Sequence, residues 1–454
     1  MNNNYTIKVY NSLTNSLEDF KTITPGVVTM YVCGPTVYDH QHIGNARPVI
    51  FFDTVKRFFK YIGYEVKHVS NFTDIDDKII KRAKEKGVSE KEISETYIKS
   101  FIDANIMLNC EMDVIRPKVT ENMEGILDFI DSLVQNGNAY VSGDDVYFRV
   151  NSCEKYGCLS NQKLDDLDIG NRIEINTGKE DPRDFTLWKK TSDDGIKWPS
   201  KYGDGRPGWH TECVVMIHNL LGQKIDIHGG GIDLKFPHHE NENAQNYCLT
   251  NDVLANFWIH NARVDLKGEK MSKSLGNVIW IKDMCEQHHP MAFRLMILSN
   301  HYRQNINFDE TLMQQMEGEY QKIVNSYTSL YRKLELDNKI DNTIKESKVL
   351  SIMDDFLKAL AWDFNTSNAI VSLYDLLKKI NVDLRNKNTD MNVFQEEYKT
   401  LVDMLYILGI KVDVTPLTEE EKNIVNNWYN ARNNKDFEKA DYYRNEITSR
   451  GIKL

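Results

Sequence analysis

Hydrophobic and polar positions follow two different patterns along the chain. From about residue 24 to residue 300, short apolar runs alternate with helical patterns and with Gly or Pro. Val27–Cys33 is an apolar run typical of a strand, apolar residues at helical spacing lie between Ile50 and Ile62, and Tyr64–Asn71 is extended again. A strand, a helix and a strand within about 45 residues form a βαβ unit. The pattern therefore predicts an α/β fold with a doubly wound parallel sheet.

Beyond Asp309 the pattern changes, because apolar residues recur every three or four positions, as on one face of a helix. The longest such pattern covers residues 312–334, and two others cover residues 370–380 and 394–408. The polar segment Asp337–Lys348 is expected to be a connector. The chain is thus predicted to hold an α/β domain followed by a helical domain.

Composition and charge narrow the class of protein. The 454 residues, 41% hydrophobic and 27% charged, are typical of a globular chain of roughly three domains. Because there is no run of 18 apolar residues and no basic and apolar leader, we expect neither a membrane span nor export. Seven thinly spread cysteines favour the reducing cytoplasm over a disulfide framework. A net charge of −11 argues against a protein that binds nucleic acid over most of its surface. Phosphate binding, however, needs only a local patch of basic residues.

The first candidate site is the segment Gly34–Asn45, which follows the first predicted strand and opens a helix. Doubly wound sheets bind nucleotides at this position, because the amides of a helix N-terminus attract phosphate. His40 and His42 can donate hydrogen bonds to a phosphate in its transition state. Taken alone, His-Ile-Gly is more typical of a turn that carries surface histidines, although its position after a strand favours the nucleotide site.

The second candidate site is the string KMSKS at residues 270–274. Lys270 and Lys273, with hydroxyl groups between them, can clamp the charge that develops on departing pyrophosphate. Taken alone, two such lysines are typical of a solvated surface. His-Ile-Gly after the first strand together with KMSKS after the last is the paired signature of class I aminoacyl-tRNA synthetases.

The third candidate site has the chemistry of a metal centre. His238 and Glu242 are four residues apart, so a helix would bring both to one face. Cys33 ends the first strand, and Cys213 lies near the start of a predicted helix. Two thiolates, an imidazole and a carboxylate suit zinc. From spacing alone, however, the metal site is the weaker interpretation, because a buried cysteine is more often a small apolar residue.

Two other pairs have ligand-like spacing. His239 and Asn243 are also four apart, but an amide is a poor zinc ligand. Cys153 and Cys158 form a C-x4-C pair that no neighbouring residue completes, so we expect solvated or core thiols there.

Five segments, in this order, resemble cysteinyl-tRNA synthetases: YVCGPTVYDHQHIGNARP, NFTDIDDKI, GRPGWHTEC, DIHGGGIDLKFPHHENENAQ and KMSKSLGN. The resemblance runs from about Tyr5 to the C-terminal region, and several strings are specific to this family within class I. It implies ATP-dependent ligation of L-cysteine to tRNA(Cys) through a cysteinyl-adenylate. It also implies one Zn²⁺ per chain that recognises the cysteine thiolate, ATP as a substrate with Mg²⁺, no membrane partner and a monomer.

The resemblance implies roles for individual residues. The implied zinc ligands are Cys33, Cys213, His238 and Glu242. The implied ATP-binding residues are His40, His42, Gly44, Asn45 and Lys273. The implied catalytic residues are His42, Lys270 and Lys273. The residues implied to surround the amino acid and the adenylate are Thr73, Trp209, His228 and Asp233.

The resemblance also implies a domain order. A Rossmann catalytic domain would cover residues 1–266, with an insertion at about 116–201, and a connecting region with the KMSKS loop would cover 267–308. A helical bundle would cover 309–408, and a C-terminal anticodon-binding region would cover 409–454.

Two departures from the family pattern stand out. Asn45 replaces the last His of the His-Ile-Gly-His motif, and we interpret it as a tolerated variant because its amide still donates a hydrogen bond. The chain ends at Leu454, where many relatives continue into a short Trp-containing tail, so part of the anticodon-reading surface would be missing or built differently.

Two other functions compete with this one. A related ligase joins cysteine to an amino sugar with the same catalytic domain, but it would not need the helical region after Asp309. A catalytically inactive, zinc-stabilised RNA-binding relative would not need His42, Lys270 and Lys273, which are all present.

Overall fold

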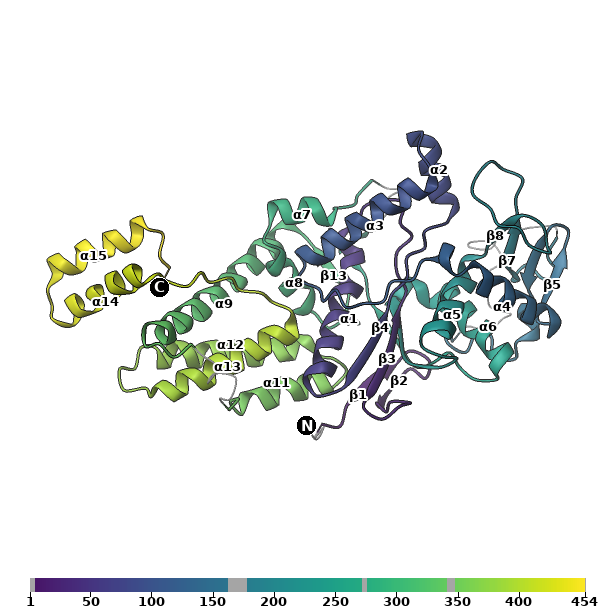
Figure 1. Ribbon diagram of the computed structural model, residues 1–454. Coiled ribbons are helices and arrows are strands. Elements are labelled where there is room, and N and C mark those ends of the chain that lie inside the picture. The colour runs from purple at the N-terminus through teal and green to yellow at the C-terminus, as the bar shows by residue number, and fades with distance from the viewer. Residues whose placement is uncertain (1–4, 162–177, 272–275, 341–347, 454) are drawn as a thin grey trace. The chain divides into compact units, whose positions relative to one another are not determined.

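The structure is a computed structural model that describes residues 5–161, 178–271, 276–340 and 348–453. The chain divides into two compact units. The first comprises Met1–Gln287, Tyr302–Phe308 and Ala361–Phe364, and the second comprises His288–His301, Asp309–Leu360 and Asn365–Leu454. Figure 1 shows their elements, and each unit is considered by itself.

A four-stranded parallel sheet forms the centre of the first unit, in the order β10-β9-β3-β4. Its strands are β3 (Val27–Val32), β4 (Glu65–Val69), β9 (Ile225–Gly231) and β10 (Ala255–Asn261). Helix α1 (Ile43–Tyr61) connects β3 to β4. The predicted βαβ unit and the parallel sheet are therefore confirmed.

Strand β9 is buried along nearly its whole length and passes through three glycines. A Cβ atom at Gly229 would lie 2.1 Å from the ring of Phe52 on α1. The missing side chain is therefore what lets α1 pack closely on the sheet. Arg47, also on α1 and buried, donates to the carbonyl oxygens of Ala262 and Arg263 at 2.8 and 2.9 Å, which ties the start of α1 to the chain after β10.

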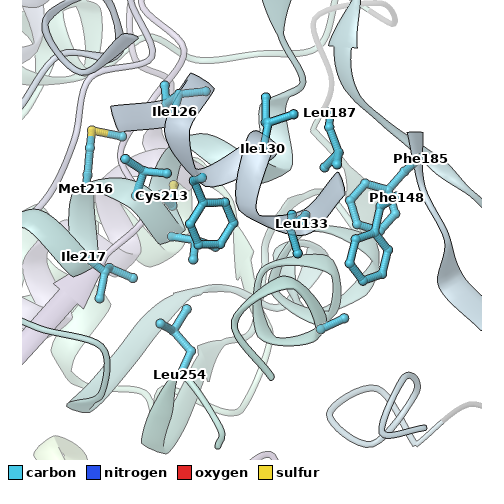
Figure 2. Packing of buried hydrophobic residues seen from close by; sticks show 14 of the residues in the cluster. Ile126, Ile130, Leu133, Phe148, Phe185, Leu187, Cys213, Met216, Ile217 and Leu254 are labelled. Carbon is cyan, nitrogen blue, oxygen red and sulfur yellow. The ribbon is translucent and has the colours of Figure 1, made fainter. Parts of the chain in front are cut away.

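A second sheet, antiparallel, is inserted between β4 and β9. Its order is β5-β6-β7-β8, and its strands are β5 (Ala139–Ser142), β6 (Asp145–Phe148), β7 (Phe185–Lys190) and β8 (Gly205–Pro207). It shares an apolar core with α4 (Met123–Gln135), α5 (Trp209–Leu220) and α6 (Glu240–Thr250). Figure 2 shows Ile130 and Leu133 of α4 near Phe148 and Phe185 of this sheet, and Cys213 in the same core.

Shorter elements complete the first unit. The hairpin β1-β2 and the three-stranded sheet β12-β11-β13 contain β1 (Lys8–Asn11), β2 (Ser16–Asp19), β11 (Val264–Leu266), β12 (Glu269–Lys270) and β13 (Ile306–Phe308). The remaining helices are α2 (Asp77–Lys86), α3 (Glu90–Met107), α7 (Ile281–Gln287) and the short turns η1 (Val119–Glu121), η2 (Val150–Ser152), η4 (Ile232–Leu234) and η5 (Lys235–His239).

The second unit is helical, as predicted. The three periodic patterns lie within α9 (Glu310–Leu336), α12 (Thr366–Asp383) and α13 (Met391–Leu408), and the connector begins where α9 ends. The other helices are α8 (Pro290–Leu298), α11 (Ile352–Ala361), α14 (Glu419–Asn433) and α15 (Phe437–Ser449). Within the described ranges, none of these helices, nor any in the first unit, is both long and apolar enough for a membrane span.

Gly409 terminates α13 in the left-handed conformation, with φ of 64°. The buried Arg294 of α8 donates to the carbonyl oxygen of Leu408 at 2.6 Å, and a Cβ atom at Gly409 would lie 2.2 Å from its guanidinium. The glycine therefore serves both the backbone turn and the packing of the arginine.

Candidate active site and metal cluster

A cleft of about 540 Å³ opens where the parallel strands of the first unit end at their carboxyl side. Doubly wound sheets bind their ligands at this edge. Seven of the residues predicted from the sequence line the cleft: Cys33, His40, His42, Gly44, Asn45, Trp209 and Asp233.

The loop before α1 is shaped by its own side chains. His42 is the N-cap of α1, and its Nδ1 accepts a hydrogen bond from the Gly44 N–H at 3.1 Å. Asn45 accepts a hydrogen bond from the His42 N–H at 3.3 Å through Oδ1, which completes a capping box. Asn45 thus closes the first turn of the helix, a role that the sequence did not reveal. His40 is turned toward α3, where its Nδ1 lies 2.6 Å from Ser100 Oγ.

The structure brings Cys33, Cys213, His238 and Glu242 together, with one donor atom of each within 4.8 Å of all the others. The two sulfur atoms are 3.7 Å apart. His238 Nε2 lies 3.7 Å from Cys213 Sγ and 2.7 Å from Glu242 Oε1. These residues come from the end of β3, from α5, from η5 and from the first turn of α6, so residues distant in sequence form one cluster.

A second set overlaps the first. Cys33 and Glu242 also lie within 4.8 Å of His228 and His239. Glu242 Oε2 is 2.5 Å from His228 Nε2, and Cys33 Sγ is 3.3 Å from His239 Nε2. Sequence reasoning set His239 aside because its helical partner is Asn243. Its actual neighbours are Cys33 after β3, His228 on β9 and His260 on β10, and spacing along one helix cannot show such contacts.

The protonation of the cluster reflects its charges. Burial raises the pKa of the Cys33 thiol well above its usual range. A hydrogen bond from Cys33 instead lowers the pKa of Cys213 to about 6. Burial disfavours the imidazolium form of His238, but Glu242 and Cys213 together outweigh this and raise the pKa of His238 to about 10. The Cys213 thiolate and the Glu242 carboxylate thus face a protonated His238, and a metal cation that bound here would displace the protons of His238 and Cys33.

The residues predicted to surround the amino acid and the adenylate differ in how buried they are and in what they contact. The indole of Trp209, 41% exposed, stacks on the His238 ring with centroids 4.1 Å apart. Thr73 is buried and donates to Glu212 Oε2 at 3.1 Å. Thr73 and His228 are both buried and are not among the described residues that line the cleft, so their predicted part in substrate binding stays a prediction.

The KMSKS string is only partly described. The backbone of Lys270 lies in β12 and pairs with Asp265 on β11. Met271 lines the cleft beside Gly44. Lys273 lies outside the described residues, so its role stays a prediction.

Comparison with known proteins adds independent information. Residues 19–318 match the family described as tRNA synthetases class I (C) catalytic domain, and residues 355–413 match the DALR domain. The chain is 41% identical over 451 residues to a cysteine–tRNA ligase of Anoxybacillus flavithermus, with 99% of this chain and 97% of that protein covered. It is 44% identical over 446 residues to one of Acholeplasma laidlawii, with 98% and 100% covered.

The solved structure of Mycobacterium tuberculosis methionyl-tRNA synthetase with methionyl-adenylate shares the fold, with a TM-score of 0.60 at 15% identity over 84% of this chain and 89% of that one. Full-length similarity above 40% identity is far beyond a shared fold alone. The chain therefore belongs to the cysteine–tRNA ligase family of the class I tRNA synthetases.

Proposed function

We propose that this protein activates L-cysteine with ATP and transfers the cysteinyl group to tRNA(Cys). The observation that carries the proposal is the Cys33–Cys213–His238–Glu242 cluster, whose Cys33 lines the cleft at the carboxyl ends of the parallel strands. All seven cysteines are free thiols, which fits the reducing cytoplasm as the place of action.

The donor atoms of the cluster fit zinc. Two sulfurs, one imidazole nitrogen and one carboxylate oxygen form a soft, tetrahedral type of ligand set, whereas the overlapping set with His228 and His239 has only one sulfur. Bound there, zinc supplies a Lewis acid that favours a thiolate over an alcohol. His228 holds Glu242 by Oε2, so that Oε1 is directed at His238, and Trp209 stacks on the same imidazole.

Activation requires positioning rather than a side-chain nucleophile, because the cysteine carboxylate attacks the α-phosphorus of ATP itself. Gly44 and Asn45 at the start of α1 line the cleft, and the positive end of the helix dipole there attracts a phosphate. Since Nδ1 of His42 accepts the Gly44 N–H, the neutral ring carries its proton on Nε2, which can donate to a phosphate oxygen. Lys270 and Lys273 would stabilise the leaving pyrophosphate, and Mg²⁺ would accompany the nucleotide.

An exchange assay tests the reaction. Pyrophosphate should exchange into ATP with cysteine and with no other amino acid, and charging of total tRNA should follow. Exchange without charging would instead favour the ligase that acts on an amino sugar. Absence of exchange with every amino acid would favour the inactive RNA-binding relative and would contradict the proposal.

The α14–α15 hairpin has the side chains of an RNA-reading surface. Phe437 is 74% exposed and Tyr442 is 61% exposed, and the guanidinium of Arg432 lies 4.8 Å from the Trp428 ring centroid. Exposed aromatic rings beside cationic groups bind unpaired bases by stacking. We therefore place anticodon recognition on this hairpin.

Removing this hairpin should separate activation from charging. Deletion of residues 414–454 keeps the Arg294–Leu408 contact, so the helices before it should remain folded. We expect unchanged cysteine-dependent exchange and strongly reduced charging of tRNA.

In the full chain, Phe437→Ala should raise the KM for tRNA about tenfold, since one stacked base contributes about 1–3 kcal/mol. Val382→Ala, at an exposed apolar position on α12 (63% exposed), is the control. Equal charging by the truncated protein would contradict the assignment.

A further inference from the structure

Asn105 on α3 and Asn261 at the end of β10 are buried polar side chains of the first unit. They are 0% and 1% exposed, respectively. In both, the amide nitrogen and the carbonyl oxygen are buried and have no hydrogen-bond partner within the described part of the chain. A buried donor or acceptor without a partner is costly, so each of these amides needs an explanation.

The two amides differ in where they lie. Asn261 lines the cleft, whereas Asn105 is not among the described residues of its wall. His260 contacts His239 on one face of the parallel sheet, so the alternation of side chains along β10 places Asn261 on the opposite face. The carbonyl oxygens of the two residues after Asn261 accept hydrogen bonds from Arg47, one helical turn into α1. Asn261 therefore lies close to the start of α1.

Apolar side chains form the neighbouring wall of the cleft. Val264 and Met271 are both buried and both line the cleft, and the pairing of β11 with β12 brings them side by side. A Cβ atom at Gly44 would lie 3.3 Å from the terminal methyl carbon of Met271, so the start of α1 meets the same wall. An apolar surface with one open amide suits the flat face and the polar edge of a nucleobase.

We propose that Asn261 recognises the adenine base of ATP and so determines which nucleotide the enzyme accepts. The inference rests on the proposed function, because it takes ATP as the nucleotide in the cleft. Adenine carries its N6 amino donor beside a ring-nitrogen acceptor, and a carboxamide pairs with both when Oδ1 accepts and Nδ2 donates. Guanine carries an acceptor, O6, in place of the amino group. Asn261 would therefore favour ATP over GTP.

Equilibrium binding to the full chain tests the inference. The probes are ATP and purine riboside triphosphate, which differs from ATP only by the missing 6-amino group, and calorimetry in the presence of Mg²⁺ gives both Kd values. We expect the wild type to bind ATP about 10- to 100-fold more tightly than the analogue, since a two-point contact of this kind separates bases by about that factor. Equal Kd values would overturn the inference.

Two variants assign the preference to one side chain. Asn261→Ala should bind ATP and the analogue equally, each with the affinity that the wild type has for the analogue. A purely structural role would weaken both nucleotides alike and keep the preference, which would overturn the inference. Asn105→Ala is the matched control, because it removes an equally buried amide from outside the cleft wall, and it should keep both wild-type Kd values. If Asn261→Ala does not fold, Asn261→Leu, which keeps more of the volume, replaces it.

The binding measurement also separates this inference from the proposed function. A protein that prefers ATP through Asn261 but shows no cysteine-dependent exchange would support the role of Asn261 and contradict the proposed function. A protein that exchanges pyrophosphate with cysteine but binds ATP and the analogue equally would support the proposed function and overturn the role of Asn261.

Discussion

Replacing Glu242 by Ala should lower the zinc content of the protein and raise the KM for cysteine about 100-fold or more, with little change in the KM for ATP. Glu242 is fully buried and contacts His238 and His228 with its two oxygens, so its loss removes a ligand and releases two imidazoles. Cysteine and serine differ by sulfur for oxygen, and a pocket that relies on shape separates such molecules by about a hundredfold. Recognition beyond that level needs a thiolate-selective metal.

Metal analysis by mass spectrometry and kinetics with both substrates measure this outcome. Cys213→Ser should have the same effect, and Cys110→Ser, at another buried thiol, should have none. His239→Asn distinguishes the two overlapping sets. If zinc binds Cys213 and His238, this variant should retain metal, and if zinc binds His228 and His239, it should lose metal.

Cobalt substitution tests direct recognition. Cysteine should add a new sulfur-to-cobalt charge-transfer band to the spectrum, and serine should not. A cobalt enzyme that activates cysteine with an unchanged spectrum would show that the metal is structural and that selectivity arises elsewhere in the cleft.

Replacing Lys273 by Ala should slow adenylate formation about 100- to 1,000-fold while leaving the fold and the zinc content intact. One oriented charge at a transition state contributes about 3–4 kcal/mol, and about 1.4 kcal/mol corresponds to tenfold in rate. Single-turnover formation of cysteinyl-adenylate measures the step directly. Lys282→Ala, at an exposed lysine on α7, is the control and should react at the wild-type rate. A Lys273→Ala enzyme within twofold of wild type would refute the clamp.

Much of the fold could be predicted from the sequence because the spacing of apolar residues shows which face of a helix or strand is buried. The βαβ unit that begins at β3 and the three long helical patterns are each defined by local spacing. The inserted antiparallel sheet could not be derived in this way, since its short strands pair across loops of very different length. The role of Gly229 is equally invisible in sequence, because it depends on where Phe52 of another element lies.

The candidate site could be predicted in part. His238 and Glu242 share a local spacing, and the two cysteines have the chemistry to complete a set, so reasoning about ligands selected four residues that the structure brings together. The contacts of His228 with Glu242 and of His239 with Cys33 depend on strand ends that meet a helix in space. These contacts join residues from different elements, so no local pattern in the sequence predicts them.

The capping box at the start of α1 constrains how this enzyme can change over evolutionary time. His42 caps the helix with one ring nitrogen and, in the proposed mechanism, would present the other to the nucleotide, while Asn45 accepts the His42 backbone N–H. A substitution at either position therefore disturbs both the start of α1 and the proposed nucleotide site. A substitution at position 45 keeps the cap only when the new side chain can still accept the His42 N–H, so Ser, Thr, Asp and the His of the family motif are open to future variants and apolar side chains are not.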